Sequence, residues 1–217
     1  HLSIRRQRQM CIRDRIDVLQ AEVKLAGDLY IRLERRWFKT GADYVAGVNR
    51  RIDRIPDLST SLDLPVWDKT THPEEEDYNE LVSTEKDWLN QDQQFIQVGG
   101  AQIEACDVLT PERQFLCVKE GSTSSKLSHL FAQASGSADL LARHAPFETE
   151  IRARYTAEWP LRDYDGQPLP TFVFVIARGA AQPLFGKMLL SKINALEHAR
   201  RIKELGFNVS VCKATLA

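Results

Sequence analysis

The chain has 217 residues, 43% of them hydrophobic, which is enough for one sizeable core, and its formal net charge is −1. It contains no run of eighteen apolar residues, and its arginine-rich start precedes no apolar segment, so we expect neither a membrane span nor a secretory signal peptide. Its four cysteines form no CxxC pair and no Cys/His metal spacing, so we expect reduced thiols and a cytoplasmic location.

The charge is unevenly distributed along the chain. Residues 1–54 carry a net charge of +6, residues 55–115 of −11 and residues 116–217 of +4. An acidic middle between basic flanks is compatible with a cation site that faces a polyanion, and equally with a solvated surface.

Residues 1–73 are expected to contribute little to the hydrophobic core of the protein. Residues 3–15, SIRRQRQMCIRDR, resemble a translated sequencing adapter of the kind found at the ends of metagenomic contigs, so we expect residues 1–15 to be non-native. Because the first residue is not methionine, we expect a portion of a longer protein. Residues 16–73 then form its N-terminal helical and linker remnant: an amphipathic helix over 16–36, a turn at Gly41 before a short strand or helix, and a proline-punctuated loop over 57–77.

Residues 74–217 predict an α/β domain. A helix begins near Glu74, with acidic residues in its first turn, and strands are expected over 95–98, 101–109 and 115–119. A Gly-Gly pair and a Thr-Pro pair supply the two turns between them. A helix or pair of helices over 124–144, a buried strand over 170–179, a helix that ends at Gly206 and a last strand complete a mixed sheet flanked by helices.

Asp107 and Lys119 stand out within this hairpin. If TPERQ is a five-residue loop, paired residue numbers sum to 224, which places Asp107 opposite Cys117 and diagonal to Lys119 on one face. Glu104 is then expected on the opposite face. A carboxylate that binds a hard cation, beside a lysine that steadies phosphate charge, suits metal-assisted phosphodiester cleavage. An ordinary ion pair at a sheet edge is the alternative.

An acidic helix, a strand pair with Asp and Lys, and a following helix with inward polar residues together resemble the core of the PD-(D/E)xK nucleases, a restriction-endonuclease-like fold. The resemblance implies a Mg²⁺ site with Glu80 and Asp107 as ligands and with Lys119 as the third catalytic residue. Cys117 stands where that family has an acid, and cysteine is a poor ligand for magnesium.

The helix after Lys119 supplies candidate contacts to substrate. Ser125 is expected to cap it, and its first-turn amides can bind a phosphate. The candidate substrate-binding residues are Ser124, Ser125, Ser128, His129 and Gln133. Capping alone, or an exposed histidine, would explain the same residues. A basic helix could line a polyanion groove or form a solvated face through Lys187, Lys192, Arg200, Arg201 and Lys203.

Longer motifs, among them EEEDYNE, IEACDVLT, FLCVKEG and SSKLSHLFAQ, are similar to a sporadically distributed family of uncharacterised bacterial proteins. That patchy distribution implies a defence or mobile-element role, which is an association and not a mechanism. The function expected is therefore a nuclease-like domain that acts on DNA or RNA. An inactive nucleic-acid-binding module and a structural or partner-binding domain remain the alternatives.

Overall fold

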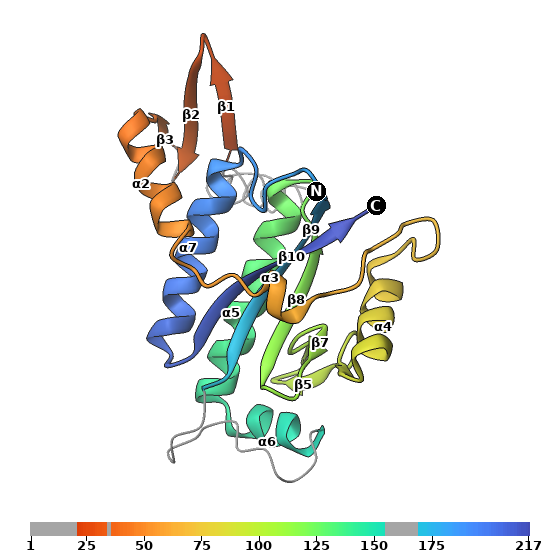
Figure 1. Ribbon diagram of the computed structural model, residues 1–217. Helices are drawn as coiled ribbons and strands as arrows, with labels where there is room; N and C mark the ends of the chain where they lie inside the picture. The colour runs from red at the N-terminus through yellow and green to blue at the C-terminus, as the bar shows by residue number, and fades with distance from the viewer. Residues whose placement is uncertain (1–20, 34–35, 155–168) are drawn as a thin grey trace, which may run out of the picture.

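In a computed structural model, the chain is described over residues 21–33, 36–154 and 169–217. Residues 1–15, the expected adapter-derived segment, lie outside this part. At the centre is a five-stranded sheet in the order β10-β9-β8-β7-β4 (Figure 1). Its strands are β4 (Leu89–Asn90), β7 (Val108–Leu109), β8 (Gln114–Glu120), β9 (Thr171–Gly179) and β10 (Asn208–Leu216). Strands β8, β9 and β10 are parallel, and β7 and β4 run antiparallel, so the predicted mixed sheet is confirmed.

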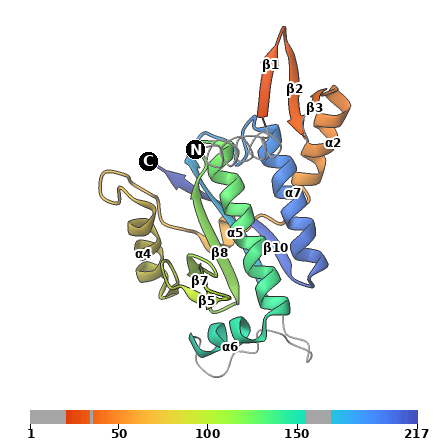
Figure 2. The ribbon, with the colours of Figure 1, turned by 180° about the vertical axis from the view of Figure 1, so that it is seen from behind.

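Helices cover both faces of this sheet. Helices α5 (Ser124–Arg143) and α7 (Leu189–Glu204) lie side by side across one face, as Figures 1 and 2 show from opposite sides. Helix α4 (Glu75–Lys86) packs near β4, β7 and β8, and its buried apolar residues Tyr78 and Val82 belong to the core of the other face. Gly206 follows α7 with a φ of +87°, which suits the predicted stop at this glycine.

Strand β9 is buried on both faces because it lies between two parallel neighbours and two layers of packing. Its aromatic residues Phe172 and Phe174 point toward α5 and α7, where Phe174 lies 4.9 Å from Phe131 between ring centroids. Its valines point the other way, into the core where Trp67 stacks on Tyr78 at 4.8 Å. The phenylalanines and valines of β9 therefore alternate between the two faces of the sheet, and each type fills the space on its own face.

The β7–β8 hairpin has the predicted register, with Leu109 opposite Phe115. The Gly-Gly turn is also confirmed, because β5 (Ile96–Val98) and β6 (Ala101–Ile103) form a two-residue hairpin around Gly99 and Gly100, both at positive φ. The single strand predicted over 101–109 is wrong. Strand β6 belongs to a separate two-stranded sheet, and residues 104–107 cross to the main sheet without regular pairing.

The helix predicted over 16–36 is wrong in the part that the structure describes. Strands β1 (Ala21–Leu25), β2 (Asp28–Leu33) and β3 (Arg36–Lys39) form a small antiparallel sheet, which projects from the body in Figure 1. Ala26 and Gly27 have φ values of 51° and 86°, as a two-residue hairpin turn requires. Inward-facing Ile31 packs with Val48 of α2 (Ala42–Ile52) and with α7, so tertiary contacts support strand over helix.

The predicted loop over 57–77 is not free of structure. It contains the short helix α3 (Ser59–Leu62) and two isolated bridges, Asp57 to Val211 and Trp67 to Leu216, along the outer edge of β10. Helix α6 (Ala145–Arg154) follows α5 and packs against it and against β5 of the two-stranded sheet. Among the described residues, no helix is long and apolar enough to cross a membrane.

Candidate metal centre

Three carboxylates gather beside the start of β7. Asp92, Glu104 and Asp107 each offer an oxygen, and these oxygens lie within 4.8 Å of one another. Asp92 lies in the loop after β4, Glu104 in the crossing segment after β6, and Asp107 directly before β7. Three segments of the chain therefore converge on one point, where hard oxygen donors could hold a metal ion.

Asp107 is fixed by the hairpin itself and is only 3% exposed. Its backbone N–H donates to the carbonyl of Leu116, the partner of Val108, at 2.9 Å, so Asp107 is held just outside the β7–β8 ladder. Its carboxylate Oδ2 accepts the backbone N–H of Val118, and its Oδ1 accepts the Gln133 amide at 3.3 Å. A side chain thus takes the place of a backbone acceptor where the ladder ends.

Backbone contacts bring the other two carboxylates to Asp107. The Gln91 N–H donates to the Asp107 carbonyl at 2.8 Å, which draws the loop carrying Asp92 against β7. Glu104 accepts the Gln93 N–H through Oε1 and the Gln133 amide through Oε2, at 2.5 and 3.1 Å. Gln133 therefore bridges Glu104 and Asp107.

Burial and the nearby negative charges shift the protonation of Asp107 and Glu104 toward the neutral form. Burial raises the pKa of Asp107 to about 8, and the charges of Glu104, Glu75 and Asp92 add to this rise against the Val118 hydrogen bond. Burial likewise raises the pKa of Glu104 to about 7, with a further rise from Asp92. A bound cation would lower both pKa values again, because its positive charge stabilises the ionised carboxylates that burial and mutual repulsion disfavour.

A fourth oxygen lies beside the group. The Asn79 amide donates to Asp92 Oδ2 at 3.0 Å, and Asn79 is 1% exposed. Its own Oδ1 is buried and has no hydrogen-bond partner within the described part of the chain. Such a buried, unsatisfied carbonyl is unusual, and it belongs to the same amide that contacts Asp92. The donor set of carboxylate and amide oxygens fits Mg²⁺ or Mn²⁺.

Lys119 lies at the end of β8, two residues after Cys117, and forms an ion pair with Glu75 of α4. Burial alone would lower the pKa of Lys119, but the Glu75 hydrogen bond and charge, with the charges of Asp107 and Glu104, leave it raised. The lysine is therefore a fixed positive charge close to the acidic group, the name used below for the carboxylates of Asp92, Glu104 and Asp107.

The predicted catalytic residues are only partly brought together. The charge of Asp107 contributes to the raised pKa of Lys119, whereas the ion pair of Lys119 is formed with Glu75. Glu80 is instead exposed on α4, and Glu75, five residues earlier, is the helix acid that contacts Lys119. The acidic residues in the first turn of this helix could have indicated Glu75 as a candidate.

Of the predicted substrate-binding residues, Gln133 reaches the acidic group and the others do not contact it. Ser128 donates to the Ser124 carbonyl and accepts the Asn194 amide of α7, so it joins two helices. Ser125 and His129 are exposed. The predicted cap is wrong, because Thr123 and not Ser125 caps α5, with its hydroxyl accepting the Lys126 N–H.

Sequence reasoning missed Asp92 as a candidate and placed Glu104 on the wrong face. The alternation of a strand would turn Glu104 away from Asp107, but residues 104–107 leave the sheet. Ser137 of α5 donates to the Glu104 carbonyl at 3.1 Å and holds this crossing. Cys117 is fully buried in the core, where burial raises the pKa of its thiol, so it is a neutral packing residue.

The basic helix is partly neutralised. Arg200 is paired with Glu197 and Glu204, and Arg201 lies 3.7 Å from Asp139. Lys192 donates to Asn49 of α2. These contacts suit a solvated face with a packing role at least as well as a polyanion groove.

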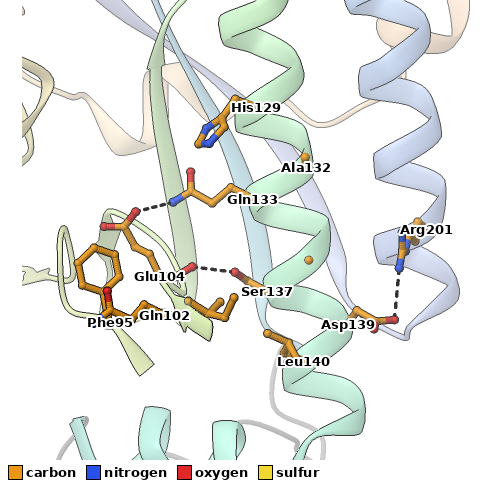
Figure 3. A pocket seen from close by; sticks show the side chains of 12 residues that line it. Phe95, Gln102, Glu104, His129, Ala132, Gln133, Ser137, Asp139, Leu140 and Arg201 are labelled. Carbon is orange, nitrogen blue, oxygen red and sulfur yellow. Dashed lines mark hydrogen bonds and ion pairs between the residues drawn. The ribbon is translucent and has the colours of Figure 1, made fainter. Parts of the chain in front are cut away.

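A pocket of about 540 Å³ opens beside the acidic group. Figure 3 shows the Gln133 amide directed at Glu104 and the Ser137 hydroxyl at the Glu104 backbone, with Arg201 across the pocket. Glu104 and Gln133 thus belong both to the carboxylate cluster and to the wall of the pocket.

Comparison with known proteins places the chain in a wider context. A family model described as a family of unknown function (DUF6119) matches residues 9–215, which is most of the chain. No curated protein and no solved structure matches it significantly. The expectation of an uncharacterised family is confirmed, and the site has to be interpreted from its own geometry.

Proposed function

The chain belongs to the DUF6119 family, whose function is unknown, and we propose that it is a metal-dependent phosphodiesterase that acts on nucleic acid. The observation that carries this proposal is the gathering of Asp92, Glu104 and Asp107 within 4.8 Å, in the electrostatic field of Lys119. Three carboxylates and a lysine at one sheet end are the groups that such chemistry requires.

The arrangement of elements supports the resemblance to PD-(D/E)xK nucleases. An acidic helix, α4, precedes the β7–β8 pair that carries Asp107 and Lys119, and α5 follows with Gln133 pointing at the carboxylates. Cys117 remains a departure from the family pattern. Glu104 and Asp92 offer the carboxylates that Cys117 does not, so the site keeps a sufficient number of oxygen donors.

Each residue then has a distinct role. Asp107, Glu104 and Asp92 hold the cation, and Gln133 keeps two of them oriented through its amide. When bound, Mg²⁺ supplies Lewis acidity toward a phosphoryl oxygen and lowers the pKa of a water. Lys119 stabilises negative charge on the phosphate, and Glu75 fixes the position of the lysine.

Cleavage of labelled DNA and RNA in Mg²⁺ and Mn²⁺ tests this proposal. We expect Asp107→Asn to abolish cleavage while it largely preserves binding, and Lys119→Ala to reduce both, with a rate loss of roughly a hundredfold or more. Glu80→Gln, which changes an exposed carboxylate of α4, is the matched control and should leave the rate unchanged. Cleavage that survives Asp107→Asn would reject the mechanism.

The buried thiol of Cys117 favours a second candidate, an inactive module that binds nucleic acid without cleaving it. In that case no variant and no divalent cation supports cleavage, whereas binding persists and weakens with salt. Absence of salt-sensitive binding as well would favour a structural or partner-binding domain.

A further inference from the structure

The pocket beside the acidic group has two unlike sides. Phe95 and Ile103 line it from the β5–β6 hairpin, while α5 contributes Ala132, Gly136 and Ser137. Figure 3 shows Phe95 on the same side of the pocket as Glu104 and below it. Its volume of about 540 Å³ lies within the range of roughly 300–1,000 Å³ typical of sites for small organic groups.

Phe95 is an exposed aromatic residue on a fixed backbone. Its side chain is 46% exposed, although it directly precedes β5. Arg154 of α6 donates to the Gln94 carbonyl at 2.6 Å and to the Phe95 carbonyl at 3.1 Å. Two hydrogen bonds from one guanidinium hold this loop in place, so the ring is presented at the pocket on an anchored backbone.

The opposite wall, on α5, includes two residues with small side chains. Ala132 and Gly136 are one helical turn apart on α5 and line the same pocket. A Cβ built on Gly136 would meet nothing within 4 Å, so the absent side chain leaves open space rather than room for a packed neighbour. Glycine inside a helix is unfavourable by about 1 kcal/mol relative to alanine, and helix packing does not require it at this position.

We propose that this pocket binds an unpaired nucleobase of a single strand whose phosphate lies at the acidic group, with the base stacked on Phe95. This inference rests on the proposed function, because Glu104 and Gln133 connect the pocket to the carboxylate cluster. A base in a duplex is stacked on its neighbours and cannot enter a recess between a helix and a hairpin, so the substrate is single-stranded or locally unpaired. Aromatic stacking accepts any base, which predicts little sequence preference.

Binding of a fluorescent 12-nucleotide DNA strand, followed by anisotropy in Ca²⁺ with the complete chain, tests the pocket. We expect Phe95→Ala to weaken binding by about tenfold or more, and Phe95→Trp to preserve it. Gly136→Leu should fill the pocket and weaken binding similarly without unfolding α5. Phe38→Ala removes an equally exposed phenylalanine, also 46% accessible, from β3 and should leave the affinity unchanged.

A matched duplex should bind more weakly than the single strand and should not respond to Phe95→Ala. Affinity for the single strand that is unchanged in both Phe95→Ala and Gly136→Leu would overturn the inference. Titration with Mn²⁺ alone, in the same variants, separates the two proposals. Loss of strand binding with normal Mn²⁺ binding supports the pocket, whereas Phe95-dependent strand binding without any Mn²⁺ binding would reject the metal centre and leave the pocket standing.

Discussion

Replacement of Asp107 by asparagine should make the metal-free protein more stable at neutral and alkaline pH. The pKa of Asp107 is raised to about 8, whereas an ordinary aspartate has a pKa of about 3.9. At pH 7 the unfolded chain carries the ionised carboxylate, and the folded chain holds it mainly protonated. Folding therefore takes up a proton, and stability falls as pH rises from about 4 to about 8.

The magnitude follows from the difference between pH 7 and the ordinary pKa. That gap is roughly three pH units, and at about 1.4 kcal/mol per unit it opposes folding by about 4 kcal/mol. Asparagine carries no such proton, and its carbonyl oxygen can still accept the Val118 N–H that Asp107 accepts. Because Glu104 also repels Asp107 and would relax in the variant, we expect a net stabilisation of about 2–4 kcal/mol.

Calorimetric melts in EDTA at pH 5 and pH 8 measure this effect. For a chain of this size, the expected stabilisation corresponds to a rise in melting temperature of roughly 4–16 °C at pH 8, and a smaller rise at pH 5. Glu80→Gln controls for the loss of one negative charge. An Asp107→Asn protein that melts at or below the wild-type temperature at pH 8 would refute the reasoning, because the carboxylate would then not be destabilising in the metal-free fold.

Three further outcomes are expected. Mg²⁺ or Mn²⁺ should raise the melting temperature of the wild type more at pH 8 than at pH 6, since the ligands must be deprotonated; an equal rise at both values would contradict the site. Glu75→Gln should destabilise the fold by about 1–3 kcal/mol by leaving Lys119 unpaired, and a second change, Lys119→Met, should recover part of that loss in chemical denaturation. Deletion of residues 1–15 should leave the melting temperature nearly unchanged; a fall of several degrees would show that residues 9–15, which the family match includes, belong to the fold.

The elements that could be predicted from sequence are those with strong local signals. The β7–β8 register follows from a five-residue loop between apolar runs, so Asp107 and Lys119 could be placed near each other. The continuous apolar run of β9 and the glycine after α7 identify a central strand and a helix end in the same way. In each case a few neighbouring residues contain the information.

The helix predicted over 16–36 failed because its apolar spacing is also compatible with alternation. The choice between helix and strand depends on Ile31, which is buried against Val48 and Leu190 from distant segments. Such a contact cannot be read from a window of twenty residues, and tertiary packing commonly overrides local preference.

The acidic group was incompletely predicted for a related reason. Asp92 and Glu104 lie in irregular segments, which are held by hydrogen bonds to distant parts of the chain, such as those from Gln91 and Ser137. Periodicity gives no information about such segments. For the helix acid, the acid-rich first turn contains several candidates, and the orientation of α4 selects Glu75 rather than Glu80.

The most direct test of the metal centre is the anomalous scattering of Mn²⁺ in crystals grown at saturating concentration near pH 8. The account predicts one strong peak within bonding distance of carboxylate oxygens from Asp107 and Glu104, with Asp92 as a further ligand, and its disappearance in Asp107→Asn. The absence of a peak at this position in the wild type, or an undiminished peak in the variant, would contradict the central claim.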